Sequence, residues 1–252
     1  MRPERALLSE IVDYAGLFPP AQLPLEKAVR EYAAHLGEEK AWMLGRFIIP
    51  AQRLEELEPH LVLFSEPLRI AALGKGGRSE DEYLKNLNQD LTAIKTFRTA
   101  QDAAVSIDSF EARLPPLPVT NAFIANVANQ LREAGLKQSH EFAVDDHLEL
   151  TMAALAAADA GAKLRCGGVT ADAVPAPEQV ARFIVAARDA GVPVKFTAGL
   201  HHPVRHFSDD IQTEMHGFLN LYVGGMLAHT TSFGWQELAG IIADQSPDAF
   251  AL

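Results

Sequence analysis

The stretch that decides the fold is Ala162-Lys163-Leu164-Arg165-Cys166-Gly167-Gly168, which precedes a helical segment at 176–190 and then Val194-Lys195-Phe196-Thr197-Ala198-Gly199. Short apolar runs of this kind, separated by a helical pattern, are typical of parallel βαβ units. Lysine is depleted from buried strands, so a lysine inside each run indicates a chemical role. We therefore predict two neighbouring strands that each present one lysine.

The same alternation extends along the chain. Candidate strands cover 9–14, 43–49, 69–73, 103–108, 141–145, 162–166 and 193–198, and candidate helices cover 24–36, 51–60, 79–100, 121–136, 147–160, 176–190 and 205–213. An eighth strand is sought at 217–223 or 248–252; the helical spacing of apolar residues assigns the first to a helix and leaves 249–252 as the last strand. No Gly-x-Gly-x-x-Gly motif follows the first strand, which disfavours a doubly wound sheet. The prediction is an α/β protein, a (β/α)8 TIM-type barrel forming a single domain over 1–252.

Composition restricts the partners. The chain has 252 residues, 48% hydrophobic and 22% charged, with a formal net charge of −11. That charge argues against a nucleic-acid partner. No apolar run reaches the roughly 18 residues of a membrane span, and the first ten residues lack signal-peptide features. The one cysteine, Cys166, excludes an internal disulfide, and we expect a cytoplasmic protein that acts on a small molecule.

Strand alternation predicts which side chains face the interior. Lys163 and Arg165 share one face of their strand, and Lys195 and Thr197 share the same face of the next. If the apolar faces pack under the helices, the charged faces point into the barrel, toward the carboxyl ends of the strands. Isolated buried charges cost several kcal/mol, so a cluster of them indicates an active site. The predicted catalytic residues are Lys163, Lys195, Asp108, Asp145 and Asp13.

Paired lysines favour amine chemistry. A lysine is a nucleophile only when neutral, and burial or a neighbouring cation promotes the neutral form. Lys163 is expected to have Arg165 and Lys195 beside it, which favours a Schiff-base lysine with an aspartate, Asp108 or Asp145, carrying protons. The sequence leaves open which lysine is the nucleophile, although Lys163 fits better. The resulting hypothesis is an aldolase or other lyase that acts on an anionic carbonyl compound.

The anionic part of the substrate is either a carboxylate or a phosphate. It is expected to bind to arginine guanidinium groups, to glycine backbone amides and to polar side chains beyond the seventh strand. The predicted substrate-binding residues are Arg46, Arg165, Gly167, Gly168, Thr197, Gly199, His201, His202, Arg205, His216 and Asn220.

Two other functions remain open. His201 and His202, with further histidines nearby, are compatible with a metal-dependent lyase or hydrolase. The spacing matches no standard metal motif, so the preferred hypothesis involves no cofactor and no metal. The third hypothesis is an anion-binding barrel without catalysis. The loop at 18–20 is either a lid or an interface, which leaves room for a homo-oligomer.

The paired lysines on the sixth and seventh strands, with acids on earlier strands, resemble the deoxyribose-phosphate aldolase type of class I aldolase barrel. That resemblance implies a (β/α)8 fold and a Schiff-base lysine. The segments 13–20 and 195–203 also resemble a family of uncharacterised bacterial proteins, a likeness that implies no activity.

Overall fold

The computed structural model describes Arg5 and residues 8–250, and the chain divides into two compact units. The first unit holds the described residues up to Pro115 together with Asn129–Gln138. The second unit holds Pro116–Ala128 and the described residues from Ser139 onward. The single domain over 1–252 remains a prediction.

The first unit contains four parallel strands whose order in the sheet follows their order in the chain. Its elements are β1 (Val12–Tyr14), α2 (Leu25–His35), η1 (Ala41–Met43), β2 (Leu44–Pro50), η2 (Ala51–Leu63), β3 (Leu68–Leu73), α3 (Glu80–Gln101), η3 (Asp102–Ala104) and β4 (Val105–Arg113). The η elements are 3-10 helices, and η2 replaces the helix predicted at 51–60.

Aromatic packing joins the first strands to their helix. Tyr32 of α2 is buried against Phe47 of β2, with ring centroids 5.5 Å apart, and Tyr14 stacks on the same phenylalanine at 5.7 Å. Phe47 and Ile49 therefore face the helix, while Ile48 between them faces the other way. The start of α3 agrees with the helix predicted from residue 79, because the Ser79 hydroxyl caps it by accepting a hydrogen bond from the Glu82 amide at 3.2 Å.

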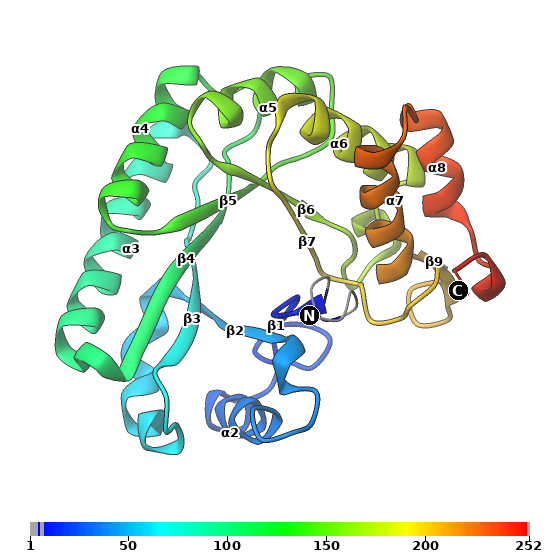
Figure 1. Ribbon diagram of the computed structural model, residues 1–252. Helices are drawn as coiled ribbons and strands as arrows, with labels where there is room; N and C mark the ends of the chain where they lie inside the picture. Colours follow the sequence, from blue (N-terminus) through cyan, green and yellow to red (C-terminus); the bar gives the residue numbers. More distant parts are fainter. Residues whose placement is uncertain (1–4, 6–7, 251–252) are drawn as a thin grey trace. The chain divides into compact units, whose positions relative to one another are not determined.

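Two elements, α4 (Asn121–Glu133) and β5 (Lys137–Glu141), have residues in both units. The rest of the second unit comprises α5 (Leu148–Ala157), β6 (Gly161–Arg165), η4 (Ala171–Ala173), α6 (Pro177–Ala190), β7 (Val194–Thr197), β8 (His206–Ser208), β9 (Thr213–Met215), α7 (Phe218–Thr230), α8 (Trp235–Ala243) and η5 (Pro247–Phe250). Strands β5, β6 and β7 are parallel and in chain order. In Figure 1, α7 and α8 (orange and red) lie side by side, and both pack on α6.

These elements confirm the α/β class, the seven predicted parallel strands and the helical segments after the first six of them, and two predictions in the second unit are wrong. The helix predicted at 205–213 is wrong, because β8 and β9 form an antiparallel hairpin there. The last strand predicted at 249–252 is also wrong where it can be checked, since residues up to 250 belong to η5; residues 251–252 lie outside the described part. No helix in the described ranges is both long and apolar enough to span a bilayer.

Candidate active site

A row of three charged side chains crosses the parallel strands of the second unit. Glu141 of β5 is paired in register with Lys163 of β6, and Lys163 is paired with Lys195 of β7. Residues paired in register on neighbouring parallel strands point to the same face of the sheet. The two lysines therefore share one face, as strand alternation predicted, and a glutamate joins them.

The row faces away from the helix that covers β7. The next register pair, Leu164 with Phe196, points to the opposite face. There the Phe196 ring lies 6.4 Å from the ring of Phe183, a fully buried residue of α6. The lysines consequently occupy the face of β6 and β7 that is turned away from α6, where a barrel places its interior side chains.

Lys163 and Lys195 are less exposed to solvent than the other lysines that the structure describes. Lys163 is 8% exposed and Lys195 is half-buried, whereas every other lysine in the sequence is exposed. The Lys163 Nζ lies 3.5 Å from Glu141 Oε2, and only 11% and 14% of the two side chains are exposed. A charged pair this well shielded interacts several times more strongly than a surface pair.

Glu141 is not among the predicted site residues, because the fifth strand was predicted at 141–145 and the observed β5 begins four residues earlier. The observed β5 begins with Lys137-Gln138-Ser139-His140, a polar stretch, whereas the predicted strand followed the apolar residues at 142–144. Asp145 consequently lies beyond β5, in the turn before α5, where its Oδ1 accepts the His147 amide at 2.8 Å. Gly135 lies just beyond the end of α4 and has a left-handed φ of 67°, as a glycine that ends a helix does. The position of this glycine is the signal that β5 begins soon after it.

The glycines after β6 and β7 let two loops meet. A Cβ added to Gly167 would lie 2.8 Å from the Gly199 Cα, so no other residue fits without a shift of backbone. Gly199 has a φ of 72°, in the left-handed region, and Ala198 before it has a φ of 61°. Gly168 is equally tight, with Ala173 Cβ at 2.5 Å. The contacts explain these glycines by packing, and their predicted role in binding a ligand remains a prediction.

Arg165 and Thr197 form the next register pair beyond the lysines. Arg165 is exposed, and its Nε donates to the Gly167 carbonyl at 2.9 Å. Thr197 is half-buried, and its carbonyl accepts the Cys166 amide at 2.7 Å. Both stand at the carboxyl ends of the lysine strands, where a substrate of the amines would lie.

The histidines beyond β7 do not converge on one point. His201 and His202 are exposed, and the His202 ring lies 3.9 Å from that of His206. Within the described part of the chain, no three His, Cys, Asp or Glu side chains come together as a metal-binding group. The metal-dependent hypothesis therefore gains no support from the arrangement of these residues.

Arg205, His216 and Asn220 form a connected cluster in the second unit. The Arg205 Nη1 lies 3.1 Å from His216 Nδ1, and His216 Nε2 lies 2.7 Å from the Pro175 carbonyl. Because Nε2 must donate to that carbonyl, Nδ1 is the acceptor for Arg205. Asn220 Oδ1 accepts the Arg205 amide at 2.9 Å, and its amide nitrogen donates to two carbonyls at the end of α8, those of Ile241 and Asp244.

Burial fixes the charge state of this cluster. His216 and Asn220 are 0% exposed. Burial lowers the pKa of His216 to about 4, so its imidazole is neutral at pH 7. Both side chains use their hydrogen-bonding groups within the protein, and both contact Arg205; their predicted role in binding a substrate remains a prediction.

Asp13, Arg46 and Asp108 form a separate network in the first unit. Arg46 Nε and Nη2 donate to the two Asp108 carboxylate oxygens at 2.6 and 2.7 Å, and the Arg46 amide donates to Asp13 Oδ1 at 2.6 Å. The hydrogen bonds from Arg46 hold the pKa of Asp108 below its usual range. A carboxylate bound at both oxygens is a poor proton carrier at neutral pH.

The place of this network in the sheet differs from the prediction. Arg46 and Asp108 were expected in the carboxyl-terminal halves of their strands, but Arg46 is the third residue of β2 and Asp108 the fourth of β4. Both positions lie at irregularities in strand register, which turn side chains out of strict alternation. The amino-terminal end of barrel strands serves stability, so this geometry favours a structural role for the network.

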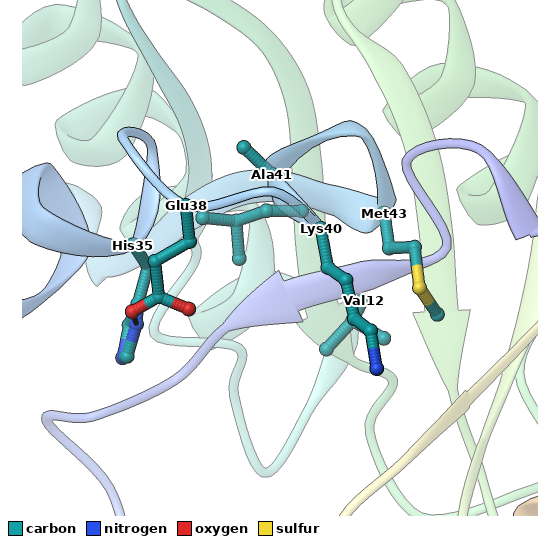
Figure 2. Close-up of a pocket in the computed structure, with 7 residues that line it drawn as sticks. Val12, His35, Glu38, Lys40, Ala41 and Met43 are labelled. Atoms are coloured by element: carbon teal, nitrogen blue, oxygen red, sulfur yellow. Dashed lines mark hydrogen bonds and ion pairs between the residues drawn. The ribbon is translucent and has the colours of Figure 1, made fainter.

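A surface hollow of about 170 Å³ lies in the first unit, at the amino-terminal ends of β1 and β2. Figure 2 shows its rim, with the His35–Glu38 ion pair on one side and Lys40 and Met43 on the other. No predicted site residue lines it, and it lies at the end of the strands opposite to the one that barrel enzymes use.

Comparisons with known proteins agree with the fold. No protein-family model matches the sequence, and no curated protein matches it significantly. Among solved structures, the chain is similar to the tetrameric deoxyribose phosphate aldolase from Aeropyrum pernix, with 13% identity, 81% of this chain and 82% of that chain covered, and a TM-score of 0.53. It is also similar to the HMG-CoA lyase from Brucella melitensis, with 13% identity, 91% and 81% covered, and a TM-score of 0.47. The likeness to the aldolase confirms the predicted fold: the chain has the (β/α)8-type architecture of the aldolase barrels.

Proposed function

We propose that this protein is a lyase of the class I aldolase type, which forms a Schiff base between Lys163 and a small carbonyl compound. The observation that carries the proposal is the row formed by Glu141, Lys163 and Lys195, which are in register on three neighbouring strands. Among the lysines that the structure describes, these two alone are withdrawn from solvent. Lysine is placed in such a position at the expense of solvation, which argues for chemistry rather than stability.

The row supplies the groups that imine formation needs. Glu141 accepts a proton from the Lys163 ammonium, and the neutral amine then forms a carbon–nitrogen bond to the carbonyl carbon while the carbonyl oxygen takes up a proton. Loss of that oxygen as water gives a protonated imine. The protonated imine draws the electron pair of the bond between the α and β carbons toward nitrogen. As this bond breaks, the hydroxyl group on the β carbon gives its proton to the Glu141 carboxylate, the β carbon leaves as a second carbonyl compound, and an enamine remains. Protonation of the enamine and hydrolysis release the product and restore Lys163.

Lys195 has a different task in the proposal. Its side chain, on the neighbouring strand at the same level, lies beside the carbonyl compound that Lys163 attacks and takes part in the proton transfers of imine formation. The similar aldolase fold is compatible with this chemistry, although fold alone does not define function. Asp13, Asp108 and Asp145 have no part in the proposed steps, because each already accepts hydrogen bonds from other groups of the protein.

Borohydride trapping tests the proposal. The protein is incubated with a panel of small aldehydes and ketones, reduced, and examined by intact mass for a stable secondary amine. We expect an adduct in the wild type that disappears in Lys163→Met and forms more slowly in Lys195→Met. Lys85→Met, at an exposed site on α3, is the matched control and should trap normally. Equal trapping by the wild type and Lys163→Met would contradict the proposal.

The similar aldolase is a tetramer, and for this chain a homo-oligomer remains a prediction. Light scattering on the purified protein gives its mass in solution directly.

A further inference from the structure

We propose that Arg205 binds the anionic group, a carboxylate or a phosphate, of the carbonyl compound that the lysines attack. The inference rests on the proposed function for the identity of the ligand, but the anion site itself is argued from the surroundings of this arginine.

The first observation is what Arg205 lacks. Its guanidinium makes a single side-chain hydrogen bond, to the neutral His216, and among the described residues no carboxylate lies within ion-pair distance of it. Arg46 and Arg69 are, by contrast, bound at two nitrogens by a carboxylate, and Arg188 donates to two carbonyls and to Asp189. Arg205 thus keeps donors for a ligand, whereas Arg46, Arg69 and Arg188 have already used theirs.

The second observation is that this arginine is held in place. Asn220 fixes its backbone and His216 fixes its side chain, and both of these residues are completely buried. Burial disfavours the charged form of the guanidinium and so lowers the pKa of Arg205. A guanidinium that is oriented by neutral partners and partly stripped of water gains more from an anion than a mobile surface arginine does.

Two carboxylates lie near Arg205, but neither is bound to its guanidinium group. The carboxylates that act on Arg205 from a distance are Glu214 on β9 and Glu178 on α6, and neither forms an ion pair with it. Glu214 Oε2 is itself buried without a hydrogen-bond partner. These acids offset part of the positive charge but do not occupy the guanidinium nitrogens, and Arg205 is exposed enough for a ligand to reach it.

The position of the cluster connects it to the lysine strands. Met215, which directly precedes His216, packs its Cε against the loops after β6 and β7: it would lie 3.2 Å from a Cβ on Gly167 and 2.8 Å from one on Gly199. Arg205 is therefore anchored at the carboxyl ends of the strands that carry Lys163 and Lys195. This is the end at which barrel enzymes bind substrate.

The first arm of the test needs no carbonyl chemistry. Wild-type protein labelled with ¹⁵N is titrated with sodium phosphate and, separately, with sodium acetate at constant ionic strength, and the arginine Nε–Hε signals are followed by NMR. The Arg205 signal is identified by its loss in Arg205→Lys. We expect a saturable shift of that signal, and the anion that produces it distinguishes phosphate from carboxylate. No shift, or the same shift with sodium chloride, would overturn the proposal.

The second arm uses three two-carbon aldehydes: glyoxylate, which carries a carboxylate; glycolaldehyde phosphate, which carries a phosphate; and glycolaldehyde, which is neutral. In Arg205→Gln we expect the rate of borohydride-trapped adduct to fall about 10- to 100-fold for the preferred anionic aldehyde, the loss expected for hydrogen bonds to a charged group. The rate with glycolaldehyde should remain within about twofold, as should all three rates in Arg182→Gln, whose arginine pairs at the surface with Glu149.

The two arms separate the possible failures. An equal loss of rate with all three aldehydes in Arg205→Gln shows a structural role and overturns the proposal. If Arg205→Gln does not fold, Arg205→Lys replaces it, because lysine keeps the positive charge but cannot donate two parallel hydrogen bonds to one anion. In Arg205→Lys we expect the preference for the anionic aldehyde over glycolaldehyde to weaken. If no aldehyde is trapped by any variant, the proposed function fails, while the NMR titration still decides whether Arg205 binds anions.

Discussion

The pair Lys163–Glu141 makes a quantitative prediction about stability. At 3.5 Å two unit charges attract by about 5 kcal/mol in an effective dielectric constant of about 20. Removing one member leaves the other charge buried, which typically destabilises a protein by about 3–5 kcal/mol. Because a glutamine side chain still offers its carbonyl to the ammonium, we expect Glu141→Gln to lower the free energy of unfolding by about 3 kcal/mol.

A double-mutant cycle isolates the interaction. Lys163→Met removes the other charge, so the double variant should be more stable than the sum of the single losses predicts, by about 2–3 kcal/mol. The assay is urea denaturation at pH 7 followed by circular dichroism. Glu149→Gln is the matched control, because its partner Arg182 lies at 3.8 Å on the surface and the loss should stay below about 0.5 kcal/mol. A coupling below about 0.5 kcal/mol in the Lys163–Glu141 cycle would refute the reasoning.

Three further predictions follow from the burial and packing of other residues. Burial lowers the pKa of His140 and of His216 to about 4. The free energy of unfolding should therefore be highest above about pH 6.5 and fall toward pH 4, by up to about 1.4 kcal/mol per pH unit for each histidine. Urea titrations across this range should show a flatter profile for His140→Gln, and a wild-type profile without slope would contradict the prediction. Asp108→Asn should reduce the melting temperature by breaking the contacts with Arg46, yet leave borohydride trapping within about twofold; a large loss of trapping would restore Asp108 as a catalytic candidate. Gly167→Ala should lower the free energy of unfolding by about 1–3 kcal/mol, because the new methyl group meets the Gly199 backbone. Gly225→Ala on α7, where nothing lies within 4 Å of the new methyl group, should raise it by about 0.5–1 kcal/mol. The denaturant midpoints of the two variants should move in opposite directions.

The lysine strands were predictable because their signals are local. A short apolar run ending in glycine places Lys163 and Lys195 on strands, and strict alternation then decides which face they share. The capped start of α3 at Ser79 was predictable for the same reason. In each case the deciding interaction lies within a few residues of sequence.

The remaining features depend on contacts that the local pattern does not contain. β5 consists largely of polar residues, so Glu141 was assigned to the beginning of a strand rather than its end. Arg46 and Asp108 lie at register irregularities, where counting every second residue fails. His216 and Asn220 look like ligand-binding residues in the sequence, and only their complete burial identifies them as supports for Arg205.

The measurement that tests the central claim most directly is the position of the reduced adduct in a peptide map. Wild-type protein is trapped with the best carbonyl compound of the panel, digested, and sequenced by mass spectrometry. The account predicts a modified Lys163, with Lys195 and the exposed lysines unmodified. An adduct spread over the exposed lysines, or one that persists at full yield in Lys163→Met, would contradict it.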